Sequence, residues 1–485
     1  MKISATHPVL IQGGMGVGVS GYRLARAVSA LGPAHLGVVS GTALDAVFTR
    51  RLQDGDPGGD VRRALAAFPF PEIADQLVAD YFMEGGRPTS QPYKSKPLVG
   101  QSPSKRAEQL LVASNFVEVF LAKEGHTNAV GINYLTKIQT PLLPSIYGAM
   151  LAGVDYVLMG AGIPKHVPAL LDGLAAGRPV TQQLDITGAD KALPFLQTFD
   201  PAAFSSRAPT ALERPTFLAI VSGASLANML TRRADGYVDG FIVEHNTAGG
   251  HNAPPRGKMQ FNERGEPVYG ARDEADLSAF RDLGRPFWLA GGWATPERVA
   301  EALDGGAAGI QVGTAFAFCR ESGIRDDLKA KVVESVQQGR PMIFTDPKSS
   351  PTGFPFKGVT LEGTVVDQEV LAGRVRRCDQ GYLREGYVKE DGTLGWRCPS
   401  EPTEAYVGKG ADGEATQGRV CLCNGLLAGI GLGQVHADGI EEPPLLTAGD
   451  ALSDIPRFIP QGQSTYSAAD VVRTIMRDRE PEPVA

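Results

Sequence analysis

Eight short apolar runs alternate with helix-like segments from the amino terminus to about residue 320. Most runs are continuously apolar, which is typical of parallel strands buried on both faces. They cover Val9–Gln12, Leu36–Ser40, Ala129–Asn133, Tyr156–Gly160, Phe217–Ser222, Gly240–Glu244, Phe287–Gly291 and Gly309–Gly313. Helices are predicted between them over Gly21–Leu31, Ala107–Leu121, Leu143–Ala152, Val167–Leu174, Ala224–Arg233 and Thr295–Leu303. This alternation predicts an α/β fold, a (β/α)8 TIM barrel.

Two regions depart from the strand–helix spacing. Residues 45–125 are too long for one unit and contain a Gly- and Pro-rich patch, which predicts a helical insertion over the barrel mouth. Four of the five cysteines lie beyond residue 340. We therefore expect a barrel domain over residues 1–340, a small cysteine-containing subdomain over 341–440, and a tail over 441–485 with a short helix, Ser467–Asp478.

Composition narrows the class of partner. The chain of 485 residues is 42% hydrophobic and 21% charged, as is usual for a soluble globular enzyme. Its net charge of −7 is spread without a basic block, which argues against nucleic acid or an anionic membrane as partner. The first residues lack the apolar segment of a signal peptide, and no span is long enough to cross a bilayer. A cytoplasmic protein is expected.

Two consecutive strand ends carry glycine turns. Ala290-Gly291-Gly292 is followed, one helix later, by Gln311-Val312-Gly313-Thr314. Such turns place backbone N–H groups side by side, and in a TIM barrel the loops after strands seven and eight are the usual phosphate site. The pattern predicts a phosphorylated cofactor. The alternative is that these glycines only cap the strands, which would produce the same sequence pattern.

The first predicted strand also ends in glycines. Gly16, Gly18 and Gly21 fit a dinucleotide fingerprint, but the second strand ends Val39-Ser40-Gly41 without the acidic residue that would hold a ribose. The other interpretation is that Gly13 and Gly14 let the backbone lie against a planar ring, which Met15 covers.

A histidine-containing loop follows the sixth strand. His245 and His251 both lie in it, and His251 comes directly after Gly249 and Gly250. Reactive groups of a barrel lie at this end of the strands, and imidazole titrates near neutrality. His251 is therefore the predicted general acid or base, and His245 is a weaker candidate.

The cysteines suggest a second kind of site. Cys421 and Cys423 would point to one face of an extended segment, and Cys378 and Cys398 could complete a four-thiolate site for zinc or an iron–sulfur cluster. Because the spacing matches no standard pattern, four reduced structural thiols are the alternative.

Five motifs together resemble a known family. Gln12-Gly13-Gly14-Met15, Gly131-Ile132-Asn133, Ala248-Gly249-Gly250-His251, Ala290-Gly291-Gly292 and Gln311-Val312-Gly313-Thr314 are similar to the nitronate monooxygenase (2-nitropropane dioxygenase) family of FMN-dependent barrels. The stretches around Gly131–Leu135 and Gly148–Gly162 more closely resemble its trans-acting enoyl reductase subgroup of polyketide and polyunsaturated fatty acid synthesis.

The resemblance implies bound FMN. Its phosphate would lie on Gly291, Gly292, Gly313 and Thr314, its ring near Gly14, Met15 and Asn133, and His251 would face the substrate carbon. The remaining residues expected at the cofactor are Gly13, Ser222, Gly249, Gly250, Ala290 and Gln311. Thr247-Ala248 stands where the simple nitronate enzymes have Glu-Ala, which puts the substrate in doubt.

The sequence thus predicts an FMN-dependent oxidoreductase of the nitronate monooxygenase class, expected to be a homo-oligomer. The alternative is an NAD(P)H-dependent enoyl-thioester reductase that meets an acyl carrier protein. For it, Leu110, Leu111, Phe116 and Val119 would line an acyl channel with Lys94, Lys96, Lys105 and Arg106 at its entrance; an ordinary amphipathic helix is the other interpretation. A phosphate-binding barrel without flavin is the third alternative.

Overall fold

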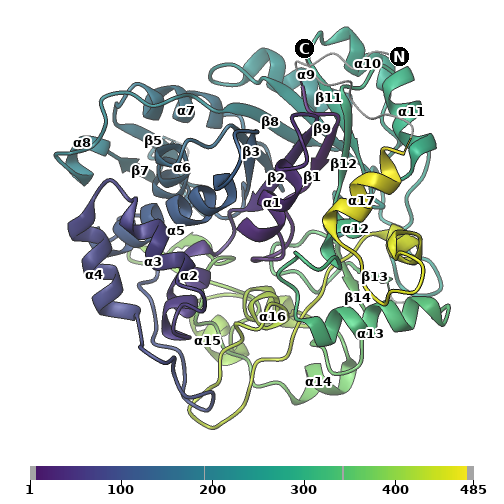
Figure 1. Cartoon of the computed structure of the whole chain (residues 1–485). Coiled ribbons are helices and arrows are strands. Elements are labelled where there is room, and N and C mark those ends of the chain that lie inside the picture. Colours follow the sequence, from purple (N-terminus) through teal and green to yellow (C-terminus); the bar gives the residue numbers. More distant parts are fainter. Residues whose placement is uncertain (1–6, 191, 341–342, 478–485) are drawn as a thin grey trace.

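The computed structural model describes residues 7–190, 192–340 and 343–477. Its centre is a closed parallel barrel with the strand order β1-β12-β11-β9-β8-β4-β3-β2 (Figure 1). The barrel strands are β1 (Leu10–Gln12), β2 (His35–Ser40), β3 (Val130–Leu135), β4 (Tyr156–Gly160), β8 (Thr216–Val221), β9 (Gly240–Glu244), β11 (Phe287–Ala290) and β12 (Gly309–Val312). They coincide with the eight predicted runs to within two residues at each end. The predicted TIM barrel is confirmed, and the Rossmann interpretation is wrong.

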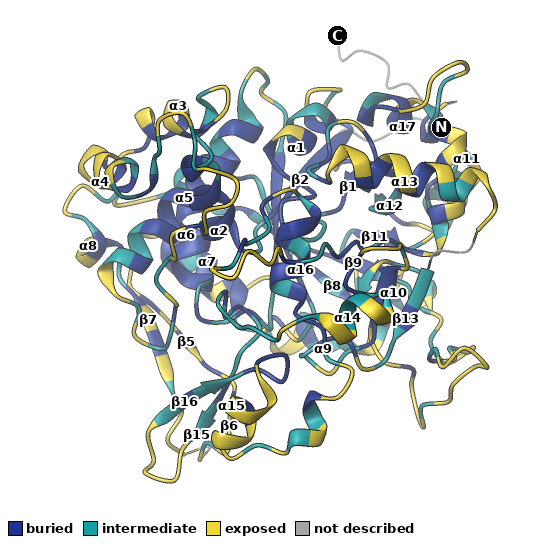
Figure 2. Cartoon of the chain, turned by 90° about the horizontal axis from the view of Figure 1, so that it is seen from below, coloured by how far each residue is buried: buried dark blue, intermediate teal, exposed yellow. Residues whose placement is uncertain are grey.

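Helices cover the outside of the barrel. They are α1 (Tyr22–Ser29), α5 (Lys105–Lys123), α6 (Leu142–Leu151), α7 (Val167–Ala175), α9 (Ala224–Arg233), α10 (Leu277–Asp282), α11 (Pro296–Asp304) and α12 (Thr314–Ala317). Exposed residues gather on the peripheral elements, while the eight barrel strands are almost wholly buried (Figure 2). Within the described residues, no helix combines the length and the apolar character needed to cross a membrane.

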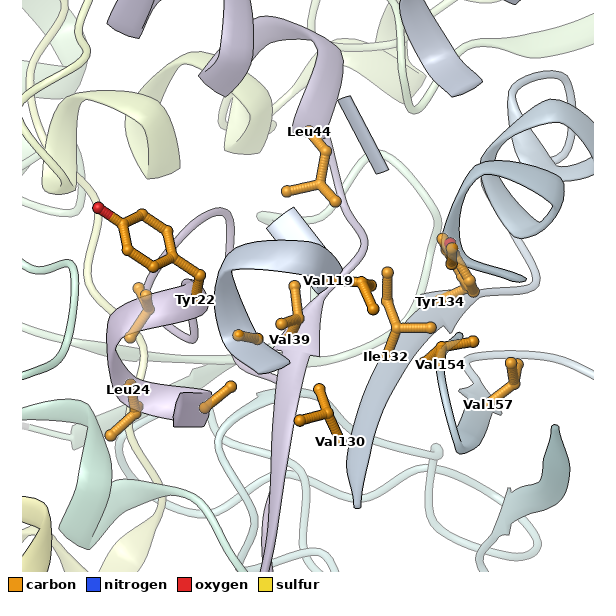
Figure 3. Packing of buried hydrophobic residues seen from close by; sticks show 14 of the residues in the cluster. Tyr22, Leu24, Val39, Leu44, Val119, Val130, Ile132, Tyr134, Val154 and Val157 are labelled. Atoms are coloured by element: carbon orange, nitrogen blue, oxygen red, sulfur yellow. The ribbon is translucent and has the colours of Figure 1, made fainter. Parts of the chain in front are cut away.

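Side chains from the strands fill two separate cores. One cluster lies inside the barrel and comprises Ile11, Leu36, Val38, Leu158, Leu218, Ile242, Trp288 and Ala290. The alternate residues of the same strands, such as Val39 and Ile132, pack outward against the helices, where Figure 3 shows them beside Leu24 of α1 and Val119 of α5. Burial on both faces explains why the strands have continuously apolar sequences.

The predicted insertion, residues 45–125, contains four helices, of which α2 (Leu44–Gln53), α3 (Asp60–Ala66) and α4 (Pro71–Tyr81) lie together beside the barrel (Figure 1). The next helix, α5, is a barrel helix that packs on α6 and α1. Its side chains Leu110, Leu111, Phe116 and Val119 are at most 4% exposed and do not line the main cavity, so the predicted acyl channel along this helix is wrong.

The predicted basic entrance is also wrong for two of its members. Lys96 is buried and forms an ion pair with Asp45, with 2.8 Å between Nζ and Oδ2. Arg106 is paired with Asp80. Each cation is thus neutralised by a neighbour in the insertion, and neither is free to meet an acidic partner.

Further elements follow β4 and β12 in the chain. Between β4 and β8 the chain forms β5 (Val180–Gln183), β6 (Ile186–Thr187), β7 (Leu196–Phe199) and α8 (Pro201–Phe204). After β12 it forms α13 (Asp326–Gln337), β13 (Ile343–Asp346), β14 (Phe356–Val359), α14 (Gln368–Gly373), β15 (Glu385–Val388), β16 (Leu394–Arg397), α15 (Thr403–Gly408), η1 (Gly413–Thr416), α16 (Leu422–Gly429), η2 (Asp450–Phe458) and α17 (Ala468–Ile475).

The region after residue 340 is joined to the barrel loops by two small sheets. β14 pairs with β10 (Gly250–His251), and β15 pairs with β6. The expected domain boundary between residues 340 and 341 adjoins residues 341 and 342, which lie outside the described residues. Asp478, the last residue of the predicted C-terminal helix, also lies outside them. The division into domains stays a prediction, but the later segments clearly build the barrel mouth.

Candidate active site

The main cavity opens at the carboxyl ends of the barrel strands. Residues from β1, β3, β9, β11 and β12 and their following loops line it on the barrel side, and α16 and η2 contribute the opposite wall. Of the residues expected at the cofactor, Gly13, Gly14, Met15, Asn133, Gly249, Gly250, Ala290, Gly291, Gly292, Gln311, Gly313 and Thr314 all line this one cavity. Their role in binding stays a prediction, but the fold does bring them together.

Buried hydrogen bonds hold the loop after β1. The Nε2 atom of Gln12 donates to Ser20 Oγ over 2.9 Å, and that hydroxyl donates to the Gly13 carbonyl over 3.0 Å. The Met15 amide donates to the same hydroxyl over 3.0 Å. A Cβ at Gly14 would lie only 2.4 Å from that of Asn133, so the close approach of β3 requires a glycine here. The loop is thereby fixed before any ligand binds.

The paired glycine turns present free amides to the cavity. Gly291 and Gly292 have φ values of +90° and +75°, which side chains rarely adopt. Among the described residues, no hydrogen bond from the amide N–H groups of Gly292, Gly313 or Thr314 is found. Because unpaired amides in a concave site favour an anion, this geometry suits a phosphate.

A buried acceptor also faces the cavity. The Oε1 atom of Gln311 has no hydrogen-bond partner in the part of the chain that the structure describes. Such an atom needs a donor from a ligand or solvent. The cavity therefore offers donors at one end and an acceptor beside them.

The structure places His251 in the wall of the cavity. β10 pairs with β14 so that His251 lies opposite Phe356, whose ring meets the imidazole edge-on at 5.0 Å between centroids. The Nε2 atom lies 2.7 Å from Ser350 Oγ. Burial lowers the pKa of His251 to about 4, so the ring is neutral at pH 7 and can accept a proton.

This pKa shift makes a testable contribution to stability. The unfolded histidine titrates near 6.5, so between pH 6.5 and about 4 the unfolded chain binds more protons than the folded one. The contribution of His251 to the free energy of unfolding is therefore complete above pH 6.5 and is lost as the pH falls from 6.5 to about 4. We expect acidification from pH 7 to 5 to destabilise the parent more than His251→Asn, by about 1 kcal/mol because the ring is partly exposed. Urea unfolding at both pH values measures the difference, and equal losses would contradict it.

Ser350 holds the imidazole in position. Its hydroxyl is fully buried and lies 2.8 Å from Thr352 Oγ1, and the Ser350 carbonyl accepts a bond from Arg419.

We expect Ser350→Ala to lower kcat by up to about tenfold, the worth of one hydrogen bond, and to shift the pH–rate profile with little change in KM. The matched control is Ser349→Ala, since the neighbouring Ser349 hydroxyl is buried without a partner. An unchanged pH–rate profile for Ser350→Ala, or an equal shift in both variants, would contradict a role for Ser350 in positioning His251.

Glu244 is a second titratable group at the cavity. It ends β9, and burial raises its pKa to about 7. It exchanges protons near neutrality, as a group that takes part in proton transfer should. The strand-end motif contained it, but its neighbours in the fold give the shift.

Two candidates lie outside the cavity. His245 Nδ1 lies 2.9 Å from Thr247 Oγ1 and its Nε2 lies 3.1 Å from Glu274, in a separate small pocket. Ser222 lines that same pocket and not the main cavity, and Arg256 donates to its carbonyl. Its contact with the cofactor stays a prediction.

The structure lends no support to the metal site predicted at Cys378, Cys398, Cys421 and Cys423, which stays a prediction. The four cysteines line one small cavity, but no group of three or more His, Cys, Asp or Glu side chains in residues 7–190, 192–340 and 343–477 could hold a metal ion.

The segment before η2 lies against the histidine loop and the second glycine turn, and no sequence motif pointed to it. The Lys357 ammonium donates to the Asn246 carbonyl over 2.8 Å and pairs with Asp450 over 2.6 Å. The Gly449 amide donates to Thr314 Oγ1 over 2.8 Å. The chain before η2 is thereby tied to both the histidine loop and the second glycine turn.

Comparisons with known proteins bear on this site. The family model for nitronate monooxygenase matches residues 191–349, about a third of the chain. No curated protein is significantly similar to the chain in sequence. Solved structures that resemble it include FabK from Thermotoga maritima, with 15% identity, a TM-score of 0.47 and coverage of 97% of this chain and 92% of that one.

Two further structures give similar values. Nitroalkane oxidase from Streptomyces ansochromogenes has 16% identity, a TM-score of 0.42 and coverage of 97% and 95%. The enoyl reductase domain of MlnA from the macrolactin biosynthesis cluster of Bacillus amyloliquefaciens has 11% identity, a TM-score of 0.46 and coverage of 97% and 93%. Likenesses this weak add nothing to the barrel already described. The family match, in contrast, spans His251 and both glycine turns, and over these residues the chain is an oxidoreductase similar to the nitronate monooxygenases.

Proposed function

We propose that the chain is an FMN-dependent oxidoreductase of the nitronate monooxygenase class. The observation that carries the proposal is the convergence of two glycine turns, the loop after β1 and His251 on one cavity within the segment that matches this family. When bound, FMN would supply the redox chemistry at the substrate carbon.

The residues present fit such a cofactor. The amides of Gly292, Gly313 and Thr314 would hold the phosphate, and Gln311 offers a buried acceptor to a polar edge. Gly13, Gly14 and Met15 form a wall that is fixed by Gln12 and Ser20 and leaves the cavity open beside Asn133.

The chain's own part in the reaction is proton transfer and positioning. The neutral imidazole of His251 accepts a proton from the substrate carbon or returns one to it, while Ser350 keeps the ring in place. Glu244 can exchange that proton near pH 7. The apolar surroundings that lower the pKa of His251 also keep water from the reacting carbon.

Anaerobic reduction tests the proposal. The purified protein should contain FMN, and we expect an alkyl nitronate to bleach the flavin absorbance in the absence of oxygen. Parallel additions of NADH, NADPH and an enoyl thioester identify the electron donor and acceptor. A colourless protein that does not take up added FMN would contradict the flavin assignment.

A second function is supported by the other wall of the cavity. Val17, Leu135, Ile138, Leu383 and Leu426 pack into one apolar cluster that borders the cavity. A small nitronate has no need of such a surface, whereas the chain of an acyl thioester would bury against it. This favours an NAD(P)H-dependent enoyl-thioester reductase, which would receive its substrate from coenzyme A or an acyl carrier protein.

Leu426→Gln separates the two functions. Leu426 lies on α16 and is partly buried at the cavity. A polar amide there should raise KM for a long-chain enoyl thioester several-fold and leave a small nitronate unaffected, because only the acyl chain loses apolar contact. Val407→Gln, on exposed α15, is the matched control. Equal effects on both substrates would count against the acyl site.

A further inference from the structure

A second, smaller cavity lies behind one wall of the main cavity. The main cavity measures about 220 Å³ and the second about 20 Å³. Residues from the end of β3, the start of α2 and the helices α5 and α6 line the second cavity. The partition between the two consists of the residues that line both, namely Thr42, Leu135, Ile138 and Tyr382. These side chains decide whether a ligand in the main cavity reaches the space behind them.

The second cavity has mostly apolar walls. Its lining includes side chains that do not reach the main cavity, among them Leu44, Leu111, Pro141 and Leu142. The Tyr134 hydroxyl donates to Asn115 Oδ1 over 2.9 Å, and Asn115 Nδ2 donates to the Leu111 carbonyl over 2.9 Å. Because these polar groups bond to one another, an apolar segment of a ligand can enter the space without leaving them unpaired.

Three contacts fix the Tyr382 ring in the partition. Its hydroxyl donates to Asp45 Oδ1 over 2.5 Å. The Lys96 ammonium pairs with Asp45 Oδ2 over 2.8 Å and lies 4.5 Å from the centre of the ring. The ring also packs with Ile138 and Leu427 in the apolar cluster that borders the main cavity. Burial and the Asp45 carboxylate raise the pKa of Tyr382 well above its usual value, so the phenol stays protonated and keeps its hydrogen bond.

We propose that the Tyr382 ring limits the length of the alkyl tail that the main cavity accepts. The tail runs along the apolar cluster toward the partition, where the ring closes the way into the second cavity. This inference rests on the proposed function in one respect, that the main cavity is the substrate site. An alkyl tail occurs in a long-chain nitronate as well as in an acyl thioester, and the experiment has an arm for each.

Removal of the ring should lengthen the accepted tail. Each methylene group that becomes buried strengthens binding by about fourfold. In the parent protein this gain should stop at the length where the tail meets the ring. In Tyr382→Ala the two cavities join, and the gain should continue over further methylene groups, which enter the space between α5 and α6.

Isothermal titration calorimetry of the full-length protein as purified tests the limit. One series of ligands is butyrate, hexanoate, octanoate and decanoate, whose carboxylate resembles the nitronate group in charge and shape. The other is the matching saturated acyl thioesters of N-acetylcysteamine. We expect affinity to stop rising at a longer chain in Tyr382→Ala than in the parent, and the series that binds identifies the source of the tail. Binding is measured without turnover, so a failed flavin or nitronate assay leaves this result readable.

Three further variants separate the ring from other causes. Tyr382→Phe keeps the ring and should show the length limit of the parent. Leu383→Ala enlarges the main cavity, but Leu383 does not line the second one, so the limit should again be that of the parent. Ile138→Ala opens the partition at another point and should raise the limit. It keeps the test decisive if Tyr382→Ala fails to fold.

Three results would overturn the proposal. The first is one and the same limit in the parent, Tyr382→Ala and Ile138→Ala. The second is an equally raised limit in Leu383→Ala, since the size of the main cavity and not the partition would then set the length. The third is a parent protein that binds neither series at any length, because the apolar wall would then hold no alkyl tail.

Discussion

Replacement of His251 with alanine is expected to lower turnover by about 10²–10⁴-fold while FMN stays bound, the usual worth of a placed general acid or base. The imidazole lies in the cavity wall with Ser350 behind it, whereas the glycine turns that would hold the phosphate lie on β11 and β12. Loss of the ring should therefore affect the proton transfer and spare the cofactor. Steady-state turnover and the flavin content of the purified variant measure the two effects separately.

His245→Ala is the control for this variant. His245 lies in the same loop but pairs with Thr247 and Glu274 outside the cavity, so its loss should change turnover by less than tenfold. Full turnover in His251→Ala together with a large loss in Glu244→Gln would move the proton transfer to Glu244. Equal losses of turnover in both histidine variants would mean that each substitution disturbs the loop and that neither ring is the base.

The barrel could be predicted because its signal is local. A parallel strand buried on both faces must be short and continuously apolar, and each such run ends near a glycine or a polar residue at the barrel mouth. β4 and β9 were predicted to the residue for this reason. The glycine turns after β11 and β12 could be read in the same way, since positive φ at Gly291 and Gly292 demands glycine.

The opposite wall of the cavity could not be predicted. Ser350 reaches His251 across 99 positions of sequence, and Lys357 reaches Asn246 across 111. These contacts depend on the pairing of β10 with β14, and a strand of two residues has no periodicity to detect. Glu244 was visible as a residue, but its raised pKa comes from burial, which only the fold supplies.

Apolar and basic patterns misled the interpretation of the insertion. A helix with apolar residues at Leu110 and Phe116 can face a ligand channel or a neighbouring helix, and the sequence pattern is the same for both. Here neighbouring helices, α1, α2, α3 and α6, pack around α5, and the Phe116 ring meets that of Phe68. Lysine is usually exposed, yet the side chain of Lys96 lies buried against Asp45 and over the ring of Tyr382. Its charge is thus paired within the chain.

Replacement of Gly292 with valine is expected to weaken FMN binding by about 10–100-fold. At φ +75° a β-branched residue costs on the order of 1–3 kcal/mol, and the turn can relieve that strain only by a rotation that moves its amide away from the phosphate. Little besides the hydroxyl of Thr247 lies near the added Cβ, so a steric clash is not the cause. Gly284→Val is the matched control, because Gly284 also has positive φ and open space but lies before β11, away from the cavity. FMN titration of both apoproteins compares the dissociation constants while thermal unfolding records the strain common to both. Weaker binding in Gly292→Val alone would locate the phosphate at this turn, and equal binding in the two variants would place it elsewhere.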